Sequence, residues 1–99
     1  MILYDLAQSV YLDESNCFAE FIQASAEKYL SIPSRGVSQA GFYVLRGAFM
    51  PSVLIESAFI SNVQEEKLLR KKSFRKKLAY CIFKGIKNFI EDYERRLNN

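Results

Sequence analysis

The last third of the chain carries a long run of apolar side chains at helical spacing. From near Ser73 to about Arg95, apolar residues recur every three or four positions, which places them on one face of an α-helix. This face consists of Phe74, Leu78, Ile82, Ile86, Phe89 and Tyr93, flanked by Cys81, Ile90 and Leu97. Gly85 stands inside this helix and weakens it by roughly 1 kcal/mol relative to Ala. A close approach to another element would explain why glycine is used there.

A second helix is predicted near the N-terminus. Residues 14–30 place apolar and small side chains on one face, and Asp13 or Ser15 can serve as the N-cap. Pro33 ends this helix, because a proline disfavours helical geometry at the residue before it. Residues 1–12 show only loose helical spacing, so we expect a weak element there.

A third, shorter helix is predicted over residues 62–70. Asn62 is a suitable N-cap, and Glu65 follows three residues later, which is close to a capping box. With the two longer helices and the weak N-terminal element, the chain is expected to form three to four helices.

The middle of the chain contains two candidate strands. Residues 41–46 are aromatic and β-branched, and residues 53–55 are continuously apolar, as expected for a strand covered on both faces. The connection over residues 47–51 is too short for a crossover between adjacent parallel strands. Either the sheet is mixed or these two strands are not neighbours. The sequence therefore predicts an α/β fold with two short strands.

Length and composition limit the possibilities. The chain has 99 residues, of which 49% are hydrophobic and 25% charged, so it suits one small globular domain and neither a disordered nor a fibrous protein. Its start lacks the features of a signal peptide, and no apolar run is long enough to span a membrane. If the protein is exported, we expect its targeting segment upstream of this sequence.

The cysteines and the missing histidines bear on metal binding. There are two cysteines, Cys17 and Cys81, and no histidine, which excludes a zinc site of the usual four-ligand kind. Because both cysteines lie in helical patterns, we favour two small buried apolar residues over a disulfide.

A cluster of basic residues lies around the start of the last helix. Seven of the chain's 14 Lys and Arg residues, and no acidic residue, fall between positions 67 and 77. They are Lys67, Arg70, Lys71, Lys72, Arg75, Lys76 and Lys77. Such a cluster is usually a solvated face, but it also suits binding to an anionic polymer. No nucleic-acid-binding motif accompanies it, and the aromatic residues of the middle segment are more typical of a core than of a stacking platform.

Glu56 is the clearest candidate for a functional residue. It directly follows the apolar run at residues 53–55, and a carboxylate next to a buried strand is costly unless it is paired or faces a wet cleft. In open α/β sheets, functional groups gather beyond the carboxyl ends of strands. The plain alternative is a glutamate at a strand end that points into solvent.

A resemblance to a known family decides between these interpretations. Five short motifs follow one another in register: RGV (35–37), AGFYVLRG (40–47), MP (50–51), VLIE (53–56) and FISN (59–62). Together they resemble the C-terminal signature of zinc-dependent N-acetylmuramoyl-L-alanine amidases, and Glu65, Leu68 and Leu69 continue it. Upstream, Asp5 to Gln8 and the helix after Glu14 resemble amidases of the cell-separation type. Residues 1–12 then fit the tail of a regulatory helical insertion.

The resemblance implies a fold and a reaction. The family has a mixed, largely parallel sheet covered by helices, so residues 1–99 would be the C-terminal portion of a single catalytic domain. Its members cleave the amide between N-acetylmuramic acid and L-alanine of the peptidoglycan stem, with zinc bound by two histidines and a glutamate. A second glutamate near the metal assists catalysis, and it corresponds to Glu56. Arg35 and Arg46 fit the motif and could contact substrate carboxylates or pair internally, and we favour the internal role.

The departures from the family pattern carry expectations of their own. The chain has no histidine, and the family's zinc ligands lie before the signature, so we expect no metal bound to this chain and little activity from it alone. Ser38 and the pair Ser57-Ala58 are milder differences. The alternative is a degenerate, non-catalytic module that binds anionic wall polymer. The resemblance implies a periplasmic or other cell-envelope location and peptidoglycan as partner. Uncovered sheet or helix surfaces would favour a homo-oligomer.

Overall fold

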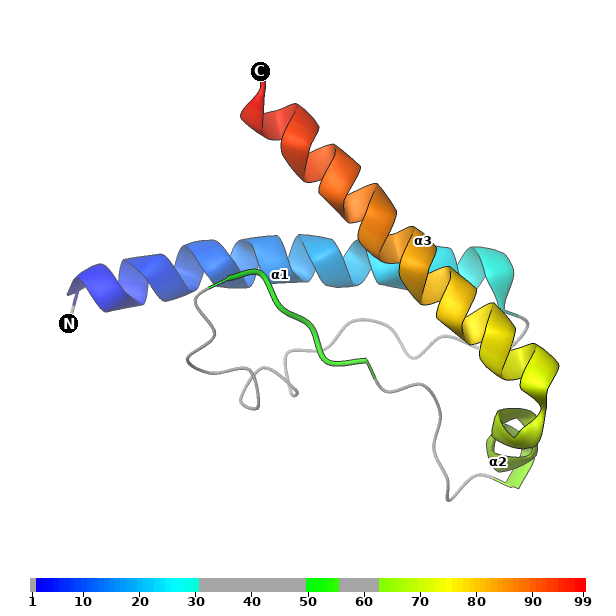
Figure 1. The fold of residues 1–99 in the computed structure, drawn as a ribbon. Coiled ribbons are helices and arrows are strands. Elements are labelled where there is room, and N and C mark those ends of the chain that lie inside the picture. Colours follow the sequence, from blue (N-terminus) through cyan, green and yellow to red (C-terminus); the bar gives the residue numbers. More distant parts are fainter. Residues whose placement is uncertain (1, 31–49, 56–62) are drawn as a thin grey trace.

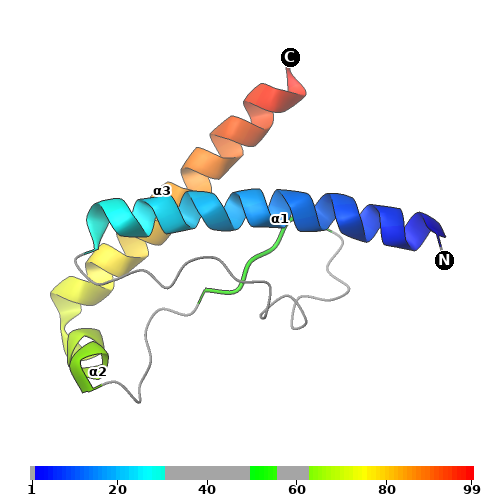
Figure 2. The same cartoon turned by 180° about the vertical axis from the view of Figure 1, so that it is seen from behind.

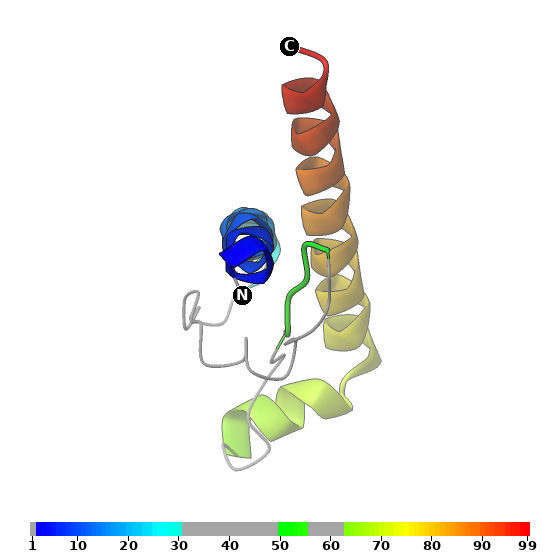
Figure 3. The same cartoon turned by 90° about the vertical axis from the view of Figure 1, so that its left-hand side faces the viewer.

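Three helices make up most of the structure, a computed structural model that describes residues 2–30, 50–55 and 63–99. In chain order they are α1 (Ile2–Tyr29), α2 (Val63–Arg70) and α3 (Lys72–Leu97). The two long helices cross each other, and α2 lies at the N-terminal end of α3 (Figure 1). A view along α1 shows α3 passing beside it and α2 turning away below (Figure 3). None of these helices is both apolar and long enough to pass through a membrane.

The prediction of an α/β fold is wrong for the part of the chain that the structure describes, because those residues contain helices and no strand. Residues 53–55, predicted to be a buried strand, have no strand structure, and Leu54 and Ile55 are 48% and 37% exposed. A strand requires a hydrogen-bonded neighbour, and no other strand lies among the described residues. The second predicted strand, at residues 41–46, lies outside them.

The N-terminal helix is longer than predicted. It runs without a break from Ile2 to Tyr29, so neither Asp13 nor Ser15 is an N-cap. The side chain of Ser15 is instead buried, and its Oγ accepts a hydrogen bond from the backbone N–H of Ser52 (2.8 Å). The weak element expected at residues 1–12 is therefore the first part of α1 from Ile2 onward.

The crossing of α1 and α3 forms the core. Gly85 of α3 lies so close to α1 that an added Cβ would be 2.7 Å from the Ile22 Cα atom. Next to it, the Ser25 hydroxyl donates a hydrogen bond to the backbone carbonyl of Cys81 (2.6 Å). Phe18 stacks on Phe89 with ring centroids 4.6 Å apart. The close approach predicted from the glycine is confirmed.

The buried face of α3 is narrower than the predicted one. Phe74, Cys81, Gly85 and Phe89 are buried, whereas Ile86 is 37% exposed. Ile86 belongs to a second apolar stripe with Phe83 and Ile90, which are 57% and 47% exposed. We call Phe83, Ile86 and Ile90 the open stripe. The helix is thus apolar on two sides, and α1 covers one of them.

Candidate functional site

The residues predicted to act on substrate are Glu56, Arg35 and Arg46, and all three lie outside the described residues. The structure does describe the chain that leads directly to Glu56. Residues 50–55 start beside the middle of α1 and run away from it toward α2 (Figure 2). The hydrogen bond from the Ser52 N–H to the buried Ser15 Oγ fixes this segment to α1.

The segment before Glu56 is attached to α1 through a backbone N–H group, whereas its apolar side chains near Glu56 are exposed. Ser52 also turns the chain locally, since its hydroxyl donates a hydrogen bond to the Met50 carbonyl (2.9 Å). The two apolar residues nearest to Glu56, Leu54 and Ile55, are exposed. The carboxylate therefore follows a segment that is anchored at one point and is apolar at its surface.

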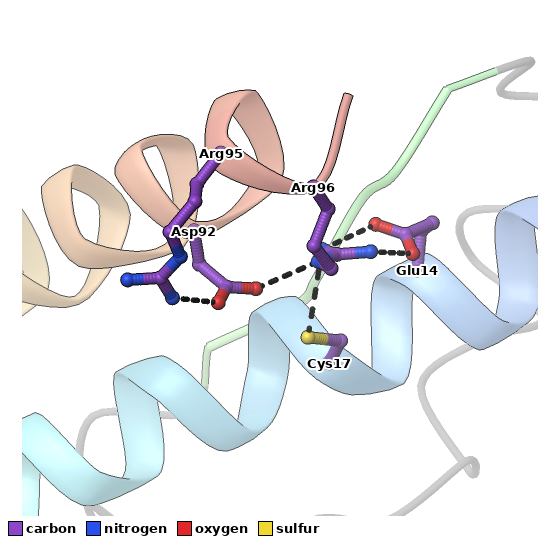
Figure 4. A network of polar contacts seen from close by, with 5 residues as sticks. All are labelled: Glu14, Cys17, Asp92, Arg95 and Arg96. Atoms are coloured by element: carbon purple, nitrogen blue, oxygen red, sulfur yellow. Dashed lines mark hydrogen bonds and ion pairs between the residues drawn. The ribbon is translucent and has the colours of Figure 1, made fainter. Parts of the chain in front are cut away.

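An arginine-centred network joins the C-terminal part of α3 to α1 (Figure 4). The Arg96 guanidinium donates to both carboxylate oxygens of Glu14, at 2.7 and 3.0 Å, and to Asp92 at 2.8 Å. Arg95 donates to the other Asp92 oxygen at 2.6 Å. The bidentate pair with Glu14 crosses from one helix to the other, so it links the C-terminal part of α3 to α1.

The charges in this network stabilise one another. Hydrogen bonds from Arg96 and Arg95 lower the pKa of Asp92 below its usual value. The hydrogen bonds that Arg96 donates to Glu14 and Asp92 raise the pKa of Arg96. Asp92 is therefore ionised at neutral pH, and its carboxylate and that of Glu14 are both already engaged by arginine. We interpret the network as structural.

Both cysteines are free thiols, as predicted. Burial raises the pKa of Cys81, and burial likewise raises the pKa of Cys17, against the opposing effect of nearby Arg96. Cys81 is 1% exposed. A thiol with a raised pKa is protonated at neutral pH, which makes it a weak nucleophile and a weak metal ligand.

The side chains that the structure describes do not form a zinc site. No group of three or more His, Cys, Asp or Glu side chains lies together among residues 11–30, 50–55 and 63–99. The whole sequence contains no histidine, and the two thiols favour the protonated form. We therefore assign no metal ligand among these described residues.

A shallow hollow lies over the open stripe on α3. Its volume is about 320 Å³, and Phe83, Ile86, Lys87, Ile90 and Glu91 line it. Lys87 and Glu91 are one helical turn apart and place opposite charges at its side. The predicted apolar face of this helix included Ile86 and its flank Ile90 but not Phe83, and the periodicity did not indicate which residues α1 would leave uncovered.

The family described as N-acetylmuramoyl-L-alanine amidase matches residues 2–88 of the chain. The match includes nearly the whole chain and the motifs that surround Glu56. The chain belongs to the N-acetylmuramoyl-L-alanine amidase family. The resemblance inferred from the motif order is thereby confirmed.

Individual amidases of the family are similar over most of this chain. The chain is 37% identical over 90 residues to the N-acetylmuramoyl-L-alanine amidase AmiC of Escherichia coli O6:H1, covering 91% of the chain and 22% of that protein. It is 33% identical over 93 residues to the amidase AmiA of Escherichia coli K12, covering 94% and 32% respectively. It is 39% identical over 71 residues to the amidase LytC of Bacillus subtilis, covering 72% and 14%.

The chain spans between a fifth and a third of the length of the two Escherichia coli relatives. No solved structure matches it. The expected division, with residues 1–99 as the C-terminal portion of one catalytic domain and residues 1–12 as the tail of an insertion, stays a prediction. The unbroken course of α1 past residue 12 gives no structural boundary at that point.

Proposed function

We propose that this chain is the C-terminal part of a peptidoglycan amidase that cleaves the amide between N-acetylmuramic acid and L-alanine of the stem peptide. The family match over residues 2–88 is the observation that carries the proposal. The relatives' names support it, since they describe N-acetylmuramoyl-L-alanine amidases and, in one case, a probable cell wall amidase. A cell-envelope location follows from this substrate.

Glu56 is the proposed acid/base residue. Amide hydrolysis requires that a water molecule lose a proton as it adds to the carbonyl carbon, and that the leaving nitrogen gain a proton as the C–N bond breaks. One carboxylate can accept the first proton and deliver it to the amine, so that no net charge accumulates. The place of Glu56 after an anchored segment supports this role, because the Ser52–Ser15 hydrogen bond limits the movement of the chain leading to it.

In this proposal zinc belongs to the complete family domain, and its ligands lie outside these 99 residues. Their composition and the described side chains do not fit the metal, so Glu56 is the one catalytic residue assigned to the chain. Arg35 and Arg46 are assigned to internal pairing, with contact to substrate carboxylates as the alternative role.

A chimeric enzyme tests the role of Glu56. These 99 residues would replace the matched region of the Escherichia coli AmiC relative, and release of stem peptide from purified muropeptides would be measured. We expect the chimera to be active and Glu56→Gln to lower kcat by about 10²- to 10⁴-fold, the usual contribution of a positioned acid/base.

Glu94→Gln is the matched control, because Glu94 lies exposed on α3 and the change is chemically the same. It should leave kcat unchanged. If Glu56→Gln and Glu94→Gln give the same turnover, Glu56 is not the acid/base residue. A folded chimera without activity would instead support the non-catalytic module.

A further inference from the structure

The end of α2 and the start of α3 together form a strongly basic surface. We use this name for Lys67, Arg70, Lys71, Lys72, Arg75, Lys76 and Lys77, all of which are exposed. Half of the chain's Lys and Arg residues therefore lie on two adjoining helix ends. A field of one sign over so small an area attracts anions more strongly than scattered charges do.

The two helix ends are fixed to each other. The Arg75 guanidinium donates a hydrogen bond to the Leu69 carbonyl in the last turn of α2 (2.7 Å). The backbone N–H of Lys71 donates to the Leu68 carbonyl at 3.0 Å, which closes the turn between the helices. The basic side chains of α2 and α3 therefore project from one preformed unit, and little ordering is needed when a ligand binds.

The two arginines and the five lysines of the basic surface differ in their pairing. Arg70 pairs with Glu66, and Arg75 is engaged with the Leu69 carbonyl. For the five lysines, no acidic partner lies within ion-pair distance in the described part of the chain. By contrast, Arg95 and Arg96 at the other end of α3 are both paired with acids. Five of the chain's eight lysines thus lie together at this end of the molecule without an acidic partner among the described residues.

This arrangement opposes the stability of α3. The first turn of the helix contains no acidic residue, although the positive end of the helix dipole favours acids there. Lys72 and Lys76 are four residues apart, where like charges repel each other along a helix. An anion bound at this end would relieve both effects.

We propose that the basic surface binds peptidoglycan through the carboxylates of its stem peptides. The proposal rests on the proposed function, because peptidoglycan is the substrate of that reaction. The available groups are lysine ammonium ions, which act as separate point charges, whereas both guanidinium groups, which suit bidentate phosphate binding, already have partners in the chain. Stem peptides along a glycan strand present separate single carboxylates, and several lysines can each bind one.

Co-sedimentation of the 99-residue chain with purified peptidoglycan sacculi tests the proposal without any hydrolysis. The test variant is Lys72→Gln/Lys76→Gln, and the matched control is Lys84→Gln/Lys87→Gln. Both remove two lysines from α3, so they differ in position and not in net charge. Loss of two exposed ion pairs should weaken binding by about five- to tenfold in the test variant. The control should bind as the unmodified chain does, and added salt should weaken binding of both.

Two further arms identify the ligand chemistry. Sacculi whose carboxylates have been converted to amides should bind the unmodified chain at least about fivefold less, which is the loss expected when the anions are removed. Inorganic polyphosphate and vesicles with an anionic phospholipid should bind less tightly than untreated sacculi. Equal binding by the two lysine variants, unchanged binding to amidated sacculi, or tighter binding to polyphosphate or vesicles would each overturn the proposal. None of these results depends on Glu56, so the failure of one proposal is distinguishable from the failure of the other.

Discussion

Replacement of Gly85 by alanine tests the closeness of the α1–α3 crossing. In an exposed helix this change stabilises by about 1 kcal/mol, because alanine has the higher helix propensity. Here the new Cβ would lie 2.7 Å from Ile22 Cα, 2.9 Å from its Cγ1 and 3.2 Å from its N. Ordinary contact begins at 3.4 Å, so the helices must separate by about 0.7 Å at this point. Two of the three atoms are backbone atoms, which a rotamer change cannot move away.

The separation of the two helices lowers the free energy of unfolding by an amount that can be approximated. A gap of this size forfeits between a quarter and a half of the dispersion energy of the contacts around it. It also lengthens the 2.6 Å Ser25–Cys81 hydrogen bond to roughly 3.3 Å, which weakens a contact worth about 1 kcal/mol. Overpacking of about 1–3 kcal/mol, less the propensity gain of about 1, leaves a net destabilisation of about 1 kcal/mol.

Urea unfolding followed by far-ultraviolet circular dichroism measures this difference. The control is Asn88→Ala, which changes propensity at an exposed position on the same helix and should stabilise it slightly. If Gly85→Ala is as stable as the unmodified chain, or more stable, the two helices do not approach as closely as 2.7 Å implies.

Two further predictions concern the open stripe and the arginine network. Because the open stripe is apolar and exposed, we expect the chain to self-associate, and Phe83→Glu should shift it toward the monomer in sedimentation equilibrium while Asn88→Glu leaves it unchanged. A monomeric unmodified chain at high concentration would contradict this. Arg96 and Arg95 lower the pKa of Asp92 in the folded chain below its ordinary value of 3.8. The stabilisation of the fold by this carboxylate is therefore complete above pH 3.8 and disappears as the pH falls through the lower folded-state pKa. The urea midpoint of the unmodified chain should therefore fall more between about pH 5 and pH 2 than that of Asp92→Asn, and equal slopes would show that the network does not perturb Asp92.

The helices could be predicted from the sequence because their signals are local. The apolar spacing from Ser73 to Arg95 predicted a helix, which the structure places at Lys72–Leu97. The helix predicted over residues 62–70 is observed at Val63–Arg70. The family could be predicted for a different reason. Five short motifs in a fixed order carry more information than any one of them, and the family match over residues 2–88 confirms that interpretation.

The signals that failed depend on residues distant in sequence. The run at residues 53–55 resembles a strand by composition, but strand formation requires a partner strand. In the described structure the residue before this run, Ser52, bonds instead to the Ser15 side chain on α1. Ser15 likewise resembled an N-cap, because capping residues and buried hydroxyls that accept a long-range hydrogen bond have the same composition.

The arginine network contains a contact that could not be predicted from local sequence patterns. Asp92 and Arg96 pair within one helix at a spacing of four residues, whereas the contact between Arg96 and Glu14 spans 82 positions, and no local sequence pattern predicts it. That contact, the Gly85 approach and the Ser25–Cys81 hydrogen bond all lie on the side of α3 that faces α1. Since these contacts occupy one side, the open stripe and the basic end remain available for partners, and the two are chemically unlike. Ammonium groups at one end suit an anionic substrate, whereas the uncovered apolar side suits another protein surface. One side of α3 thus packs against its own chain, and the proposed polymer-binding surface and the predicted self-association surface consist of separate sets of residues.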